Sequence, residues 1–260
     1  MPVKELVRRY YIKTVRYLLG RQFIKIMEGP LKGYLWTTAS SYEYILGSYE
    51  DPAVIRTFCS WLKPGTVLYD LGASIGFYSL LANRFISAGK IYAFEPVPAS
   101  RDIFQQHLEL NKSHIDNDNI SILPYAIADE KKEVLFSNSK KQQDGNTYIS
   151  SSPVFTHSET ITVQCFSIDE LLQQGFIQPG VLKIDVEGAE YDILTGAVNT
   201  LKKYKPKILL ATHDCQHPGV KDKCIHFLEA LGYTLQHTGS HNKQLAGLDD
   251  YVAIHVEDGS

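Results

Sequence analysis

The amino-acid sequence predicts an α/β fold in which helices cover both faces of a doubly wound, mostly parallel sheet. From residue 66 onward, apolar segments of strand length alternate with amphipathic segments of helix length, as in sheets built from βαβ units. The chain has 260 residues, of which 44% are hydrophobic and 21% charged. These values suit one large domain with a sizeable core, and we find no internal repeat and no second domain.

Residues 1–50 are expected to form an extension ahead of the main domain, residues 51–260. Within the extension, residues 1–27 combine basic and apolar side chains at near-helical spacing. Residues 21–39 are typical of a small β-hairpin, and residues 40–51 of an aromatic-rich loop. The basic helix either packs on the domain with a solvated face, which we favour, or makes peripheral contact with an anionic membrane.

In the main domain, each expected element follows from its local pattern. Asp51 as N-cap and Pro52 at the first helical position mark the start of the first helix. Residues 132–165 interrupt the alternation with two strands and a polar loop. The last two strands have no helix between them, so they pair antiparallel or one of them lies between other strands. Strands are expected at 66–72, 90–96, 119–128, 181–186, 205–213, 233–239 and 250–256, and helices at 51–62, 77–86, 98–111, 167–174, 187–204 and 220–232.

The bulk composition argues against several classes of protein. A net charge of -3 and a pI of about 6.3 do not favour a nucleic-acid partner. The four cysteines contain no CxxC pair and fit a reducing compartment. No apolar run reaches the roughly 18 residues of a membrane span, and we find no signal-peptide pattern. We therefore expect a soluble, cytoplasmic protein and leave its oligomeric state open.

Acidic or polar residues end almost every expected strand of the parallel sheet. In LKIDVEGAE (182–190), an apolar strand ends on Asp185 and Glu187, and burial of unpaired carboxylates is costly. Ligands of such sheets bind outside the carboxyl ends of the strands, so these residues are candidates for a site. The strand ends are Asp70-Leu71-Gly72, Glu95-Pro96, Tyr125-Ala126, Asp185-Val186-Glu187 and Thr212-His213-Asp214.

The stretch DLGASIGFY (70–78) leads from a strand through a glycine-containing turn into a helix. Gly72 and Gly76 permit a tight turn and a close backbone approach to a ligand. Glu95 follows at the spacing at which a carboxylate holds ribose hydroxyls in nucleotide sites. An NAD fingerprint is weakened, because Ser74 stands where its second glycine belongs.

These motifs resemble, in order and spacing, those of the FkbM-type S-adenosylmethionine-dependent methyltransferases. The resemblance implies the class I methyltransferase fold, a seven-stranded sheet whose antiparallel last strand is inserted beside the sixth. It also implies S-adenosylmethionine as cofactor, S-adenosylhomocysteine as product and a small-molecule or glycan acceptor. The similar stretches are GSYED, DLGASIGFYSLLANRF, KIYAFEPVPAS, NISILPYAIAD, LKIDVEGAEYDILTGA and KPKILLATH.

The resemblance also implies roles for individual positions. The glycine-containing turn would hold the methionine and ribose parts, Glu95 the ribose hydroxyls, and Asp185 the methyl end. Tyr125 and Ala126 would bracket the adenine, with Asp129 a weaker candidate. The candidate cofactor-binding residues are Glu50, Asp70, Gly72, Ala73, Ser74, Gly76, Phe77, Tyr78, Glu95, Pro96, Tyr125, Ala126 and Asp185.

Two positions depart from the family pattern. The family usually has asparagine where Ser74 stands, which is a mild change. Many members carry a glutamate near the end of the fifth strand, where this chain has Ala211. The second departure concerns the acceptor side of the site more than cofactor binding.

Methyl transfer to a hydroxyl needs a base, which contributes on the order of 10²–10⁴-fold. The catalytic candidates are His213, Asp185 and Glu187, and His213 leads because its ordinary pKa suits the task. His213 can equally be a polar loop residue, and Glu187 can merely complement a helix dipole. Glu190 is expected to be a first-turn helix charge.

The histidines and cysteines of residues 212–226 lack the spacing of a zinc site. We therefore expect no metal site, although a divalent cation at the acceptor is compatible.

Two other functions stay open on the sequence alone. An NAD-dependent oxidoreductase on a similar sheet predicts binding of a nicotinamide cofactor. A non-catalytic module that binds a partner through the basic N-terminal helix predicts cofactor binding without turnover, or no binding.

The tyrosines of residues 40–51 either cover the site, where aromatic faces suit a sulfonium cation, or pack as part of the extension.

Overall fold

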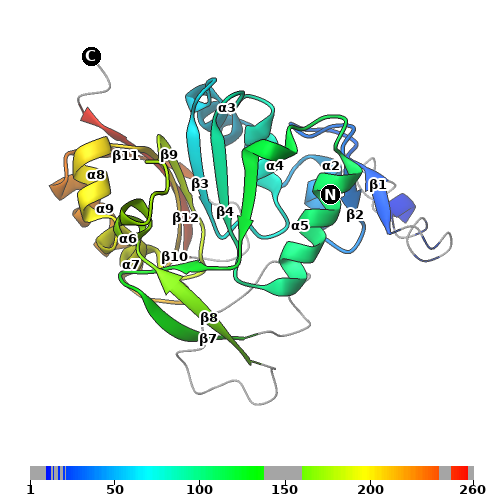
Figure 1. The fold of residues 1–260 in the computed structure, drawn as a ribbon. Helices are drawn as coiled ribbons and strands as arrows, with labels where there is room; N and C mark the ends of the chain where they lie inside the picture. The colour runs from blue at the N-terminus through cyan, green and yellow to red at the C-terminus, as the bar shows by residue number, and fades with distance from the viewer. Residues whose placement is uncertain are drawn as a thin grey trace.

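The computed structural model describes residues 10–12, 14, 17, 20, 22–137, 160–239 and 247–256. Its centre is a seven-stranded sheet with the order β11-β12-β10-β9-β3-β4-β5 (Figure 1). Five neighbouring strands pair in parallel, and β12 runs antiparallel to both β10 and β11, so that β11 has the same direction as those five. The expected α/β sheet is confirmed, and so is the insertion of the last strand. The strands are β3 (Val67–Leu71), β4 (Lys90–Phe94), β5 (Ile120–Leu123), β9 (Val181–Ile184), β10 (Lys207–His213), β11 (Tyr233–Gly239) and β12 (Leu248–His255).

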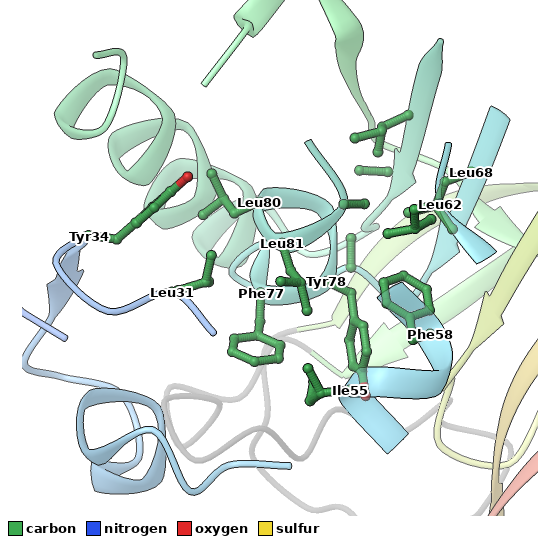
Figure 2. Packing of buried hydrophobic residues seen from close by; sticks show 14 of the residues in the cluster. Leu31, Tyr34, Ile55, Phe58, Leu62, Leu68, Phe77, Tyr78, Leu80 and Leu81 are labelled. Carbon is green, nitrogen blue, oxygen red and sulfur yellow. The ribbon is translucent and has the colours of Figure 1, made fainter. Parts of the chain in front are cut away.

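Helices cover both faces of this sheet, as Figure 1 shows. Successive residues of a strand point to opposite faces, so Leu68 joins one hydrophobic cluster while Tyr69 and Leu71 join the other. Figure 2 shows part of the first cluster, which contains Leu68 of β3 together with Phe58 and Leu81 from two helices. The first face is covered by α3 (Pro52–Trp61), α4 (Phe77–Asn83) and α5 (Pro98–Leu110), and the second by α6 (Ile168–Gln173), α7 (Glu190–Thr195), α8 (Val198–Tyr204) and α9 (Val220–Ala230).

The N-terminal extension packs on the first face through a β-hairpin. Its strands, β1 (Phe23–Lys25) and β2 (Leu35–Thr37), pair antiparallel as expected. His107 of α5 joins this hairpin to the domain, because its Nε2 accepts the Thr37 N–H at 3.0 Å while its Nδ1 lies 2.9 Å from the Ile75 carbonyl oxygen. Burial lowers the pKa of His107 to about 4, so the ring is neutral.

The expectation of a loop over residues 40–51 is wrong in part, because α2 (Tyr42–Leu46) forms there. The Ser41 side chain accepts the Glu43 N–H at the start of this helix, and Gly47 ends it in a left-handed conformation. Asp51 caps α3 and Pro52 begins it, as expected. Short polar caps of this kind permit a helix of little more than one turn between two tight bends.

Two expected elements are divided in the structure. The strand expected at 119–128 ends at Leu123, because Pro124 cannot donate to the ladder, and a 3₁₀ turn, η1 (Asn117–Asn119), precedes it. The chain then forms β6 (Ala126–Ile127), which pairs with β8 (Thr160–Phe166), and β8 also pairs with β7 (Lys132–Ser137). These three strands form a separate small sheet.

The helix expected at 187–204 begins only at Glu190 and breaks between α7 and α8. A Cβ on Gly196 would lie 2.3 Å from the Ala128 carbonyl oxygen, so the break lets the chain pass close to the segment after β6. Of the basic N-terminal segment, residues 10–12, 14 and 17 are helical. The other residues of 1–19, all of the expected polar loop at 139–158 and residues 240–246 lie outside the described residues. Within the described residues, no helix is both long and apolar enough to span a membrane.

Candidate active site

The predicted strand-end residues gather at one edge of the central sheet. Asp70 lies in β3, Glu95 follows β4, Asp185 follows β9 and His213 ends β10. These four strands are consecutive neighbours in the sheet. The structure therefore brings these four predicted residues to adjacent positions.

The turn after β3 is shaped by contacts with the protein itself. Gly72 has a φ of 75°, and a Cβ there would lie 2.0 Å from the Asp185 carbonyl oxygen. A Cβ on Gly76, whose φ is 95°, would lie 2.3 Å from the Phe104 ring. Ser74 has a φ of 49°, a left-handed conformation that is unusual for a residue with a side chain. Because Gly72 has no side chain, the turn can lie directly against the backbone that follows β9.

Glu95 ties this turn to the end of β4. Its two carboxylate oxygens accept the N–H groups of Ser74 and Val97, both at 2.8 Å. Burial raises the pKa of Glu95 to about 7, although both hydrogen bonds oppose that change. Each carboxylate oxygen can accept a further hydrogen bond. The arrangement fits a ribose, whose hydroxyls are donors that a carboxylate recognises.

Asp70 lies beneath the turn and is fully buried. Its carboxylate accepts the Ser79 hydroxyl at 2.6 Å and lies 3.3 Å from the Lys183 Nζ. The same Nζ donates to the Gly72 carbonyl oxygen at 2.8 Å and lies 3.6 Å from the Asp185 carboxylate. Burial alone would lower the pKa of Lys183, but Asp70 and Asp185 outweigh it and raise the pKa. Lys183 is not among the site residues predicted from the sequence, although a lysine inside an apolar strand signals a buried counter-charge.

His213 is buried and faces three carboxylates. Its Nδ1 lies 2.6 Å from the Glu190 Oε1, and its Nε2 lies 3.5 Å from Asp185 and 3.7 Å from Glu187. Burial lowers the pKa of His213, but the hydrogen bond to Glu190 and the other two carboxylates outweigh it and raise the pKa to about 9. His213 is thus part of a charged cluster and not a solvated loop residue.

Glu187 sits in a strained backbone position at the end of β9. Its φ is 61°, which is uncommon for a residue other than glycine and often marks a functional site. Gln216 donates to its carboxylate. Burial raises the pKa of Glu187 to about 7, and the nearby His213 opposes that change.

Glu190 was expected to be a first-turn helix charge, but it is fully buried and bonded to His213. It is the first residue of α7 and shares the buried face of that helix with Ile193 and Leu194. The spacing of three and four residues between them was the signal that could have revealed this orientation.

Aromatic side chains from the extension meet the start of α4 beside this cluster. Tyr44 and Tyr49 stack with ring centroids 3.8 Å apart, and Tyr49 meets Phe77 at 5.2 Å. The Tyr78 hydroxyl donates to Glu50 at 2.6 Å. Burial raises the pKa of Tyr49 well above its ordinary value, and the Asp185 carboxylate contributes to that rise.

Figure 2 shows Phe77 and Tyr78 side by side at the start of α4. Tyr78 also meets the Phe58 ring of α3 edge-on, with centroids 5.0 Å apart. The predicted residues Glu50, Phe77 and Tyr78 are therefore in contact with one another or share neighbours.

The remaining predicted residues lie nearer the end of β4 and the small sheet. The Ala73 N–H donates to the Phe94 carbonyl oxygen at 3.0 Å, and the Pro96 carbonyl oxygen accepts from Arg101 at 2.7 Å. Tyr125 lies beyond the end of β5, with its ring edge-on to Phe166 at 5.0 Å, and Ala126 begins β6. The weaker candidate Asp129 is exposed and pairs with Lys132. Tyr125 and Ala126 therefore do not end a strand of the central sheet as we expected.

In the part of the chain that the structure describes, no three His, Cys, Asp or Glu side chains are arranged to hold a metal ion. Asp214, which follows β10, accepts the N–H groups of Gly219 and Lys221. Its carboxylate therefore caps the start of α9.

The strand order places the protein among the class I, Rossmann-like methyltransferase folds. In these folds an antiparallel strand is inserted next to the edge strand of the sheet, as β12 is inserted next to β11 here. The chain belongs to the FkbM methyltransferase family, because the model of the methyltransferase FkbM domain matches residues 70–237. The solved structure of methyltransferase FkbM from Methylobacillus flagellatus has a similar fold, with a TM-score of 0.51 and 14% identity, and the match covers 84% of this chain and 53% of that chain.

Two curated relatives are similar to part of the chain. Hexuronic acid methyltransferase AglP from Haloferax volcanii is 28% identical in an alignment of 152 positions that covers 57% of this chain and 57% of that protein. Methyltransferase sdnD from Sordaria araneosa is 26% identical in an alignment of 162 positions that covers 52% of this chain and 61% of that protein. The chain thus matches little more than half the length of these relatives.

Proposed function

We propose that the protein is an S-adenosylmethionine-dependent methyltransferase that methylates a hydroxyl of a sugar, glycolipid or secondary metabolite. The observation that carries the proposal is the position of Glu95 at the end of β4, hydrogen-bonded to the turn after β3. Membership of the FkbM family supports the reaction type. The name of the Haloferax volcanii relative, a hexuronic acid methyltransferase, supports a sugar acceptor.

The side chains at the strand ends fit this cofactor, which supplies a methyl group on a positively charged sulfur. Glu95 would hold the ribose hydroxyls. The Asp185 carboxylate and the faces of Tyr49 and Phe77 suit a cation, which carboxylates and aromatic rings both attract. The close packing of these groups favours in-line methyl transfer, because holding reactants in line can supply roughly 7–11 kcal/mol.

We assign removal of the acceptor proton to His213, with Asp185 and Glu187 as the other candidates. The neutral imidazole is the form that accepts a proton, and the pKa of about 9 means that His213 is largely protonated at neutral pH in the free protein. A cation bound beside Asp185 lowers that pKa by like-charge repulsion. Glu187, with a pKa of about 7, stays a second candidate for the base.

Glu95 would also suit the ribose of NAD, so the sheet and the turn after β3 separate the methyltransferase from the oxidoreductase. A dinucleotide-binding sheet has six parallel strands, whereas β12 is antiparallel here. A non-catalytic module draws support only from Ala211, where many family members carry a glutamate. Both alternatives predict distinct outcomes in a binding experiment.

Calorimetric titration with S-adenosylmethionine, S-adenosylhomocysteine and NADH tests the proposal. We expect both sulfur nucleosides to bind and NADH not to bind. Glu95→Gln should weaken their binding by about tenfold to a hundredfold, since a hydrogen bond to a charged group contributes about 1.5–3 kcal/mol. The matched control is Glu109→Gln, which changes an exposed glutamate of α5. Binding of NADH alone, or no binding by the folded protein, would contradict the proposal.

A further inference from the structure

Glu190 is a fully buried carboxylate that is not among the proposed cofactor-binding residues. It projects from the first turn of α7 toward the sheet. Its Oε1 accepts the Gly188 N–H at 2.9 Å and lies 2.6 Å from the His213 Nδ1. Its Oε2 is buried with no hydrogen-bond partner among the described residues. A carboxylate placed so deeply is costly unless a cation or strong donor compensates it, and His213 is the residue at hydrogen-bond distance that can be one.

The geometry around His213 is that of a base held by an orienting acid. An Nδ1–H that donates to Glu190 leaves Nε2 as the atom directed toward Asp185 and Glu187. Catalytic histidines are oriented in this way by a carboxylate, which selects the tautomer and stabilises the imidazolium. The neutral ring then carries its lone pair on Nε2, the nitrogen that faces the strand-end cluster.

We propose that Glu190 is a positioning residue that fixes the ring orientation and the tautomer of His213, so that Nε2 faces the acceptor side of the site. Its catalytic meaning rests on the methyltransferase function proposed above. The contact itself belongs to the free protein and can be tested without cofactor or acceptor.

A merely structural role for Glu190 predicts something different. A carboxylate in a first helical turn can stabilise the helix by complementing its dipole, but this effect needs no burial and no contact with a histidine. Asp192 lies in the same first turn of α7 and is exposed. A dipole effect would therefore appear in an Asp192 variant, whereas positioning of His213 would not.

The charged groups that face His213 are Asp185, Glu187 and Glu190. Glu190 is the nearest of the three and the one at hydrogen-bond distance. Removal of its charge should therefore lower the pKa of His213 most, by roughly one to three pH units for a close opposite charge.

Long-range proton–nitrogen NMR on the histidine-labelled protein measures both the protonated nitrogen of the neutral His213 ring and the pKa of that ring. The chain has 9 histidines, and the His213 signals are identified as those that disappear in His213→Gln. In the wild-type protein we expect the neutral ring to carry its proton on Nδ1. In Glu190→Gln we expect a lower His213 pKa, while Asp192→Asn leaves it unchanged.

Three outcomes would overturn the proposal. One is a neutral wild-type ring protonated on Nε2, which can be observed even if Glu190→Gln does not fold. Another is an unchanged His213 pKa in folded Glu190→Gln, and the third is an equal change in Asp192→Asn. S-adenosylmethionine titration keeps the two proposals apart. Absence of binding by the folded wild-type protein contradicts the proposed function, whereas the role of Glu190 is judged by the His213 spectrum.

Discussion

Lys183 is a buried cation that connects the ends of two strands. It lies between the Asp70 carboxylate of β3 and the Asp185 carboxylate after β9, and it also holds the Gly72 carbonyl oxygen. Its charge therefore supports both the turn after β3 and the acidic cluster around His213. Removal of one partner of a buried ion pair is costly because the other charge stays buried without compensation.

Lys183→Met should lower the free energy of unfolding by about 3–5 kcal/mol, because it leaves the fully buried Asp70 without its cation. Urea unfolding followed by circular dichroism measures this change. The control Lys202→Met alters an exposed lysine of α8 and should stay within about 0.5 kcal/mol of the wild type. Equal midpoints for the two variants would show that Lys183 has no such role.

Local sequence patterns predicted which acids and which histidine stand at strand ends, because strand length and strand ends follow from periodicity. These patterns did not predict which charged side chains pair with one another. The pairing of His213 with Glu190 and of Lys183 with Asp70 depends on which strands become neighbours and which helix face turns inward. Those facts belong to the tertiary structure.

Gly47, which ends the short helix α2, lies in close backbone contact with the hairpin. A Cβ on Gly47, whose φ is 74°, would lie 2.1 Å from the Glu28 carbonyl oxygen. Gly33 has a similar positive φ of 92°, but no atom lies within 4 Å of its Cβ position. A side chain at Gly33 would meet only the strain of the left-handed backbone. A side chain at Gly47 would meet that strain and also a steric clash with Glu28.

Gly47→Ala should destabilise the protein by about 1–3 kcal/mol more than Gly33→Ala, because overpacking adds to the left-handed strain that both variants share. Chemical unfolding gives the difference in stability, and hydrogen exchange shows whether α2 opens. If both variants lose the same stability, the contact with Glu28 does not hold α2 in place.

Element boundaries were less predictable than element types. The capping residues Ser41 and Gly47 enclose a helix in a stretch that we took for a loop, and Gly196 divides a helix that we took as continuous. The break at Gly196 depends on the passage of Ala128 close by, which local patterns do not contain. Pro124 was a local signal for the end of β5, since it lacks an N–H.

The stability of the whole molecule should depend on pH through its buried acids. The pKa of Glu95 in the folded protein, about 7, lies above its ordinary value of 4.5. The folded state therefore binds the proton more tightly than the unfolded chain does. The contribution of this group to stability is present below about pH 4.5 and is lost as the pH rises through about 7.

Glu95→Gln should remove this part of the pH dependence. Between pH 5 and pH 8, we expect the wild type to lose up to about 3 kcal/mol relative to the variant. The variant also lacks one carboxylate oxygen, which changes its free energy of unfolding by the same amount at every pH. Unfolding free energies at several pH values measure the difference, with Glu109→Gln as the exposed control. Parallel pH curves for the wild type and Glu95→Gln would contradict the buried titration.

The position of β12 has a consequence for how the chain is made. Residues 248–255 lie between β10 and β11 in the sheet, although they follow both in sequence. While the ribosome is still synthesising the chain, the side of β10 opposite β9 has no partner strand and offers its backbone groups to any strand nearby. The His213 end of the site borders that open edge, since His213 pairs with Leu248. The sheet is therefore completed only after residue 255 has emerged, and a nascent chain stalled before that point would be prone to aggregate.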